Sequence, residues 1–131
     1  MGNKVLLIHG GAGYWLDRNR LLAALKFLER IAHDGYKVLV NEGALRAVEW
    51  VVNCMEESPI FNAGRGAVLN LLGEIELDAG IMTSDLRMGF VAAVKNVLYP
   101  ISLARIVMEE TDHLILVGEG AEMLAKSRGL L

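Results

Sequence analysis

The sequence predicts an α+β fold, in which helices pack in layers on a sheet that is at least partly antiparallel. Three observations support this prediction: an apolar run near the N-terminus that ends in glycines, two stretches of helical spacing after it, and alternation of apolar and polar residues over 74–82. The resulting order is a strand, two helices, three strands, a helix, a strand and a helix, which suits layered helices and sheet better than regular βαβ winding. With 131 residues, 53% of them hydrophobic, the chain is expected to form one compact unit.

The first three elements follow from the spacing of apolar residues. Residues 4–9 form a short apolar run that stops at glycines, as expected of a buried strand that leads into a flexible turn. Over residues 17–32 apolar side chains recur every three or four positions, which predicts an amphipathic helix. A second helix is predicted after Gly43 and is expected to stop at Ser58–Pro59, because the residue before a proline disfavours helical backbone. On this second helix, the side chains placed on the outward face are Arg46, Glu49, Asn53 and Glu56.

The clearest periodicity of the chain lies at 74–82, where every second residue is apolar, and it predicts a strand with one buried face. Residues 67–71 precede this strand across Leu72–Gly73, so the two segments are expected to pair as a hairpin. Four further elements are expected: a strand at 89–97, a helix opened by Tyr99–Pro100, a strand at 113–117 and a helix over 120–128.

Charge and cysteine content exclude several classes of function. Thirteen Lys and Arg against sixteen Asp and Glu give a net charge of −3, which disfavours binding to nucleic acid or to a membrane surface. The lone cysteine, Cys54, excludes a disulfide framework and a cysteine-based metal site within the chain. Since the N-terminal residues also lack the pattern of a secretion signal, a cytoplasmic location is expected. The large apolar fraction favours an interface on part of the surface, and the alternative is a core filled with Met and Leu in excess.

Two glycine-rich segments are candidates for binding, and each has a plainer alternative. Residues 8–13 place three glycines at the end of a strand, where the backbone can approach a ligand closely. Their spacing differs from a dinucleotide-binding fingerprint, and the residues alone favour a tight turn with His9 in the core. Residues 61–66 form an irregular loop whose main-chain oxygens either converge on a hard cation or face water, and spacing alone favours a simple connector.

Other polar residues carry less information about function. Glu74, Glu76 and Asp78 share one strand face, either as a carboxylate cluster for acid–base chemistry or a divalent metal, or as a solvated face, which is the more common case. No catalytic role is assigned to four residues that lack a partner at suitable spacing: His33, Ser84, Ser102 and His113.

Taken together, several blocks of sequence resemble one known family. They are IHGGAG at 8–13, FNAGRGAVLN at 61–70, IELDAGIM at 75–82, PISLARIVMEETDHLILVGEGAEMLA at 100–125 and the terminal Arg128–Gly129. In this order and spacing they resemble the α subunit of the plant-type L-asparaginases, also called isoaspartyl peptidases. The resemblance covers almost the whole chain.

The resemblance implies an N-terminal-nucleophile hydrolase with an αββα sandwich, made as a precursor that cleaves itself into α and β chains. Residues 1–131 are then the α-subunit portion of a single αββα domain that a separate β chain completes. The β subunit of the same precursor is the expected partner, in an assembly of the form (αβ)₂. The expected substrates are L-asparagine and isoaspartyl dipeptides. The nucleophilic threonine would open the β chain and is not in this chain, because only an N-terminal threonine has a free amine beside its hydroxyl to act as base. Alone, the chain is expected to be inactive.

The resemblance also assigns site residues. Gly10 and Gly11 would place backbone beside the nucleophile, and Asn62 would supply a supporting side-chain amide near the catalytic centre. No cofactor is expected for catalysis. A structural sodium ion is implied, held by the main-chain oxygens of six residues: Met55, Glu56, Ser58, Phe61, Ala63 and Arg65.

The chain departs from the family pattern at a few positions, and two alternatives to the asparaginase function remain open. Arg46 replaces an acidic residue, Tyr99 replaces an asparagine before the proline, and Trp15 and Asp17 occupy a variable early loop. A glycosylasparaginase α subunit shares the LDA and ARxVMExT blocks but lacks the HGGAG and FNAGxG pair in this form. The other alternative is a noncatalytic remnant or binding module without a β chain.

Overall fold

The structure is a computed structural model that describes residues 2–131. Its N-terminal half is a hairpin of two helices, α1 (Arg18–Glu42) and α2 (Ala44–Glu57), which meet at Gly43. Asp17 caps α1, because its carboxylate accepts hydrogen bonds from the Asn19 and Arg20 amides at 2.7 and 3.3 Å. Helix α1 starts where the sequence predicts it and continues ten residues beyond residue 32, since Leu39 is buried in that extension.

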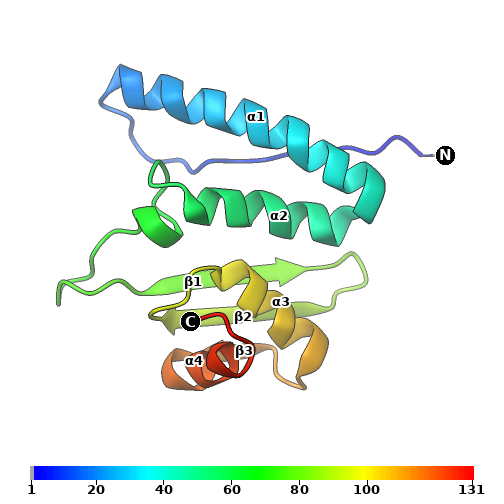
Figure 1. Cartoon of the computed structure of the whole chain (residues 1–131), viewed down its shortest axis with the longest axis vertical. Coiled ribbons are helices and arrows are strands. Elements are labelled where there is room, and N and C mark those ends of the chain that lie inside the picture. The colour runs from blue at the N-terminus through cyan, green and yellow to red at the C-terminus, as the bar shows by residue number, and fades with distance from the viewer. Residues whose placement is uncertain (1) are drawn as a thin grey trace.

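The C-terminal half combines a three-stranded sheet with two helices (Figure 1). Strand β1 (Leu77–Met82) pairs antiparallel with β2 (Met88–Val94), and β2 pairs in parallel with β3 (Ile115–Val117). Helices α3 (Pro100–Glu110) and α4 (Gly118–Ser127) pack on one face of this sheet, and α2 packs on α3. The predicted α+β class and the mixed strand directions are therefore confirmed.

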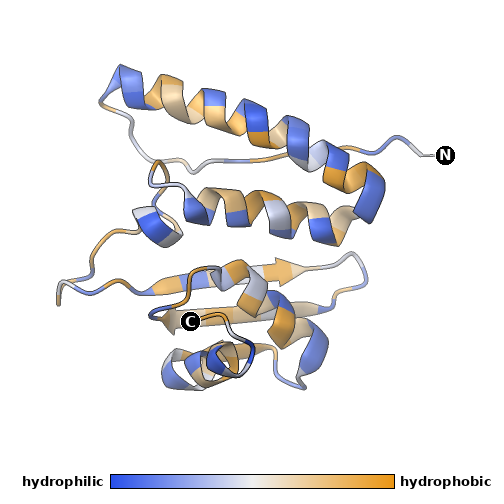
Figure 2. Ribbon diagram, viewed as in Figure 1, coloured by the Kyte–Doolittle hydropathy of each residue, from blue (hydrophilic) through white to orange (hydrophobic). Residues whose placement is uncertain are grey.

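The core lies between the sheet and the two C-terminal helices. Its buried members come from both strands of the antiparallel pair, from the loop after β2 and from both helices: Ile81, Val91, Val94, Val97, Ile101, Leu103, Ala104, Val107, Ala121 and Ala125. In β1 the exposed fraction falls to 5% at Ile81 and rises to 59% at Met82, which confirms the predicted one-sided burial of that strand. Figure 2 shows hydrophobic residues along much of β1 and β2.

Two predicted strands do not form in this structure. Residues 4–9 are extended but unpaired, with Val5 and Leu7 79% and 90% exposed; an extended segment becomes a strand only beside a neighbour, and the sheet lies on the far side of α2. Residues 67–71 also form no strand, because Asn70 closes a tight turn in which its side-chain oxygen accepts from the amides of Leu72 and Glu74 at 2.9 and 3.0 Å. The antiparallel partner of β1 is instead β2.

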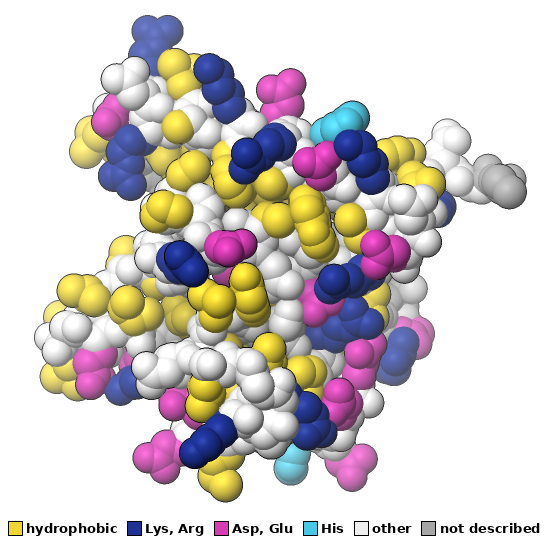
Figure 3. Space-filling view, in the orientation of Figure 1, with side chains coloured by type: hydrophobic (Ala, Val, Ile, Leu, Met, Phe, Trp, Pro, Cys, Tyr) yellow, Lys and Arg dark blue, Asp and Glu magenta, His cyan; other side chains and the backbone are white. Residues whose placement is uncertain are grey.

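Much of the apolar excess lies on the surface. The face of the sheet opposite the helices exposes Met82, Ile115 and Val117 by more than half, and Phe90 shares that face through its pairing with Ile115. A second apolar area is the protruding segment 67–75, where Leu71 is fully exposed and Leu72 is largely exposed. Hydrophobic side chains gather there at the left of Figure 3. These exposures favour the predicted interface over a core with excess Met and Leu.

The described residues contain no helix that is both long enough and apolar enough to cross a bilayer.

Candidate functional site

The glycine-rich segment after residue 9 and the loop after α2 meet in one hollow. This hollow has a volume of about 370 Å³ and is lined by residues 10–17, Arg20 and residues 60–62. The structure therefore brings together Gly10, Gly11 and Asn62, the three residues that the sequence resemblance assigns to the catalytic centre.

Close packing explains why glycine occupies position 10. A β-carbon there would lie 2.9 Å from both the Leu28 and the Phe61 side chains, so a larger residue would require these two side chains to move. His9 is exposed, not in the core as the residues alone suggest, and its Nδ1 accepts a hydrogen bond from the Gly11 amide at 3.0 Å. This local bond shapes the turn that lines the hollow.

The Asn62 side chain is available for a ligand. It is exposed at the hollow, and its amide group forms no hydrogen bond within residues 2–131. By contrast, the hydroxyl of Ser58, earlier in the same loop, accepts a hydrogen bond from the Ile60 amide at 3.3 Å. A side-chain amide presents two N–H donors and a carbonyl acceptor. Asn62 can therefore donate to an oxygen placed in the hollow.

The loop that follows α2 is folded tightly around the 3₁₀ turn η1 (Gly64–Gly66). A β-carbon on Gly64 would lie 2.2 Å from the Glu56 carbonyl oxygen, and one on Gly66 would lie 1.9 Å from that of Phe61. The carbonyls of Met55 and Ala63 accept from the Ser58 and Gly66 amides at 3.2 and 3.1 Å. Four of the six carbonyls implied as sodium ligands are thus placed by contacts within one compact turn.

These carbonyls are a suitable donor set for a hard monovalent cation. A carbonyl oxygen that accepts one hydrogen bond, as those of Met55 and Ala63 do, keeps a second lone pair, and main-chain oxygens alone suit a cation of low charge. The contacts do not place the carbonyls of Ser58 and Arg65 in the same way. The main-chain oxygens of Met55, Glu56, Phe61 and Ala63 lie around this turn, and a sodium ion held by the six carbonyls stays a prediction.

Below the loop, α3 covers a face of α2 that the sequence analysis placed in solvent. Glu49 and Glu56 are only 6% and 3% exposed, so the outward assignment of these two side chains is wrong. The reason is tertiary: α3 presents Ser102 and Arg105 one turn apart, and these polar groups meet the polar face of α2. The sequence carries one signal for this contact, namely polar residues at complementary spacing on two helices. That signal does not indicate which helices pair.

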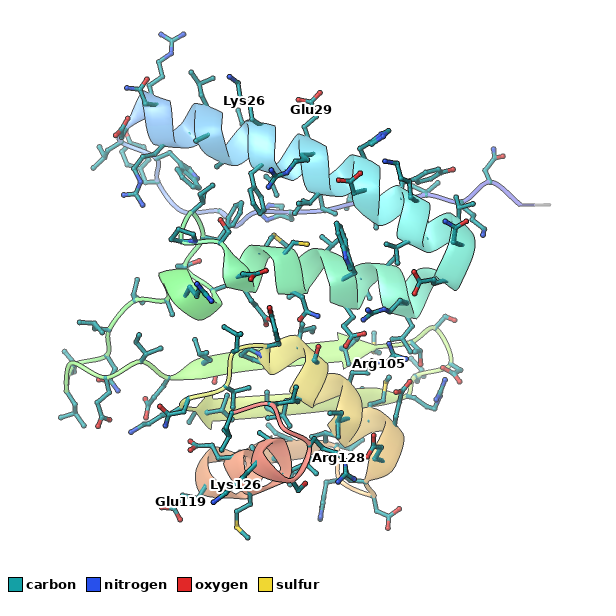
Figure 4. All side chains as sticks on the ribbon, viewed as in Figure 1. Lys26, Glu29, Arg105, Glu119, Lys126 and Arg128 are labelled. Carbon is teal, nitrogen blue, oxygen red and sulfur yellow. The ribbon has the colours of Figure 1, made fainter. Side chains whose placement is uncertain are left out.

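Glu49 is the centre of this polar contact. It accepts from Ser102 Oγ and Arg105 at 2.7 Å each, and from Arg46 at 3.0 Å; Arg105 lies between α2 and α3 in Figure 4. Burial, the largest single effect, raises the pKa of Glu49, but the three hydrogen bonds together lower the pKa below its usual value. Arg46, a departure from the family pattern, thus has a partner in Glu49.

We expect Glu49→Ala to lower the free energy of unfolding by about 2 kcal/mol, because the Ser102 hydroxyl loses its nearest acceptor and Arg105 keeps only Glu109 as a carboxylate partner. Since the pKa of Glu49 is lower in the folded state, the stabilisation is present above the ordinary glutamate pKa of 4.5 and is lost as the pH falls through the folded value. Denaturant titrations at pH 7 and at acidic pH measure both effects. The control is Glu29→Ala, on the outer side of α1 in Figure 4; equal losses in the two variants would contradict the expectation.

Glu56 differs from Glu49 in having one oxygen without a partner. Its Oε1 accepts from the Ile101 amide at 3.0 Å, while Oε2 is buried and forms no hydrogen bond with the described residues. The pKa of Glu56 is raised to about 8: burial is the largest cause, the hydrogen bond from the Ile101 amide opposes the rise, and the negative charge of Glu49 adds to it.

The acidic row of β1 and the segment before it is held by local contacts. Glu74 pairs with Lys95 at 2.6 Å, Glu76 accepts from Asn70 at 3.0 Å, and Asp78 accepts from the Ala93 amide at 2.8 Å. Within residues 2–131 no group of His, Cys, Asp and Glu side chains is arranged to hold a metal ion. These contacts favour the solvated-face interpretation over an acid–base cluster.

Comparison with known proteins agrees with the residues assembled here. The model of the asparaginase family matches residues 2–131. The chain is 44% identical over 128 residues to the isoaspartyl peptidase/L-asparaginase of Mus musculus, covering 96% of this chain and 39% of the mouse protein. It is 46% identical over 129 residues to the protein of the same name from Xenopus laevis, with 96% and 41% covered.

A plant-type L-asparaginase of Pyrococcus abyssi is 44% identical over 125 residues, which are 95% of this chain and 41% of the archaeal protein. The chain thus spans about two fifths of the length of the curated relatives that it matches. Since the family model covers all described residues, the chain belongs to the asparaginase family.

Proposed function

We propose that this chain is the α portion of an amidohydrolase that acts on L-asparagine and isoaspartyl dipeptides. The observation that carries the proposal is the convergence of Gly10, Gly11 and Asn62 on one hollow. Relatives named isoaspartyl peptidase/L-asparaginase, at 44% and 46% identity, support the substrate class.

In the proposed reaction, the nucleophile is a threonine at the N-terminus of a β chain that lies outside these residues. Its amine takes the proton of its own hydroxyl, and the oxygen attacks the side-chain carbonyl of the substrate. The C–N bond then breaks, the leaving amine receives the proton, and water hydrolyses the resulting acyl-enzyme ester. Asn62 donates a hydrogen bond to charge that develops near it, and the turn at Gly10 and Gly11 leaves backbone room for the nucleophile.

The proposed partner is that β chain, in an assembly of the form (αβ)₂, so that residues 1–131 form only part of one αββα domain. The uncovered face of the sheet and the exposed residues 67–75 supply apolar area for such an interface. The unpaired segment 4–9 fits the same arrangement, because its neighbouring strand would come from the β chain.

We also propose a structural sodium ion in the loop, held by the main-chain oxygens of Met55, Glu56, Ser58, Phe61, Ala63 and Arg65. The ion would keep the loop ordered, and Asn62 with it. Replacing sodium by tetramethylammonium at equal ionic strength is then expected to lower thermal stability and activity together. At a sodium concentration a hundred times the Kd the loss is about 2.7 kcal/mol. Identical melting curves and rates in the two salts would leave the loop as a connector.

A hydrolysis assay tests the proposed function. The complete protein that contains this chain should release ammonia from L-asparagine and free aspartate from a β-aspartyl dipeptide. Cleavage of glycosylated asparagine alone would favour a glycosylasparaginase, and no cleavage of any of the three would favour a noncatalytic module. Either result would overturn the proposal.

A further inference from the structure

Glu56 links three parts of the fold that surround the Asn62 loop. Its carbonyl oxygen lies against Gly64, close enough that a β-carbon there would be 2.2 Å away. Its side chain reaches the other way, to the Ile101 amide at 3.0 Å. One residue at the end of α2 therefore contacts both the loop turn and the start of α3.

The contact with Ile101 supplies a cap that α3 otherwise lacks. The first amides of a helix have no partner within the helix. At the N-terminus of α3, Tyr99 makes no side-chain capping bond and Pro100 has no N–H, so Ile101 carries the first free donor. Glu56 satisfies that donor from a different helix, which fixes α3 and the C-terminal turn of α2 relative to each other.

Glu56 also borders the space beneath the loop. A cavity of about 200 Å³ is lined by Glu56, Asn62, Gly64 and Pro100, among others. The hollow that contains Gly10 and Gly11 is lined by Asn62 but not by Glu56. With a side chain that is 3% exposed, Glu56 cannot touch a substrate in that hollow and can act on it only through the loop.

We propose that Glu56 is a positioning residue, which holds the loop so that the Asn62 amide is correctly placed at the reaction site. This inference rests on the proposed function and extends it to a residue outside the hollow. The hydrogen bond from the Ile101 amide depends on the length of the Glu56 side chain, because a side chain one carbon shorter moves its oxygen away from that amide. A displacement of about 1 Å at a catalytic group can cost roughly 10²-fold in rate.

The test compares E56D, E56Q and the matched control E57D in the complete protein. Glu57 is the exposed neighbour on the same helix. E56D keeps the carboxylate but is too short for Ile101, and it is expected to lower kcat about 10- to 100-fold with KM within about threefold, since the contribution of Asn62 is made in the transition state. E56Q keeps the length and an acceptor oxygen, so its kcat is expected to stay within about threefold, as is that of E57D.

Amide hydrogen exchange supplies a readout that does not depend on catalysis. E56D is expected to exchange faster than the parent over residues 60–66, and E57D is expected to match the parent. If the parent protein hydrolyses none of the substrates, the proposed function fails, whereas unchanged loop exchange in E56D would overturn the role of Glu56 by itself. The two failures are thus distinguishable.

A second substitution separates positioning from stability. Y99S gives α3 a cap of its own, since serine is a favoured N-cap residue. In the double variant E56D/Y99S we expect the Tm to rise above that of E56D, because α3 is capped again. We expect kcat to stay low, because the new cap does not join α3 to α2. Recovery of kcat together with Tm would show a merely structural role and overturn the proposal. Should E56D not fold, a tenfold or larger loss of kcat in the isosteric E56Q would also overturn it.

Discussion

Asn62→Ala is expected to lower the kcat of the complete enzyme by roughly 10²- to 10³-fold, the usual cost of removing one donor to developing negative charge. Asn62 lines the hollow with Gly10 and Gly11, and its amide forms no hydrogen bond within residues 2–131 that would occupy it. The amide is therefore free to act on the substrate. Because the bond strengthens in the transition state, KM is expected to change much less than kcat. Steady-state kinetics with L-asparagine measure both.

The matched control is Asn19→Ala, an exposed asparagine in the first turn of α1 that does not line the hollow. It should leave kcat and KM unchanged, and both variants should melt at the temperature of the parent protein. If kcat of Asn62→Ala is unchanged as well, Asn62 does not belong to the site.

Gly66→Ala is expected to have the largest effect on the loop. A β-carbon at this position would lie 1.9 Å from the Phe61 carbonyl oxygen, so the backbone of the turn must move apart. Forced overpacking of this kind costs about 1–3 kcal/mol or more, and the upper end applies because the obstacle is main chain. We expect a loss of about 3 kcal/mol in the free energy of unfolding, measured by denaturant titration, together with loss of activity as Asn62 is displaced.

Gly120→Ala in α4 provides the comparison, since no atom lies within 4 Å of a β-carbon built there. That variant should keep its activity and gain up to about 1 kcal/mol, the usual advantage of alanine over glycine within a helix. A Gly66→Ala protein as stable and active as Gly120→Ala would show that the loop does not depend on the close approach of these two segments.

The sequence predicts the helices well because their signals are local. The helical spacing that begins at residue 17, the stop at Ser58–Pro59 and Pro100 at the first turn of α3 each act within a few residues, and each coincides with a helix end in the structure. Alternation over residues 74–82 likewise predicts β1, because a period of two depends only on which face is covered.

Strand pairing and buried polar contacts depend on distant segments, and there the sequence is less informative. The apolar run at 4–9 resembles a buried strand, yet within the described residues it has no neighbour to pair with. Glu49 and Glu56 have the spacing of a solvent face, and only the position of α3 makes that face an interior one. Local periodicity reports which residues share a face, but tertiary packing decides what covers the face.

The candidate site shows the same division. The pairing of Gly10 and Gly11 with Asn62 is predicted by resemblance alone, since about fifty residues separate them in sequence, and the structure places all three at one hollow. The carbonyls of the loop carry no side-chain pattern, because any residue supplies a main-chain oxygen. Glu56 could be assigned a role only once its contacts with Ile101 and Gly64 were visible.

The central claim is that this chain acts with a β chain whose N-terminal threonine is the nucleophile. Intact-mass measurement and N-terminal sequencing of the complete purified protein test it most directly, with an assay on L-asparagine of the same sample. We expect two chains in equal amounts, the second beginning with threonine, and activity that disappears when this threonine is replaced by alanine. A single uncleaved chain with full activity, or an active protein without an N-terminal threonine, would contradict the claim.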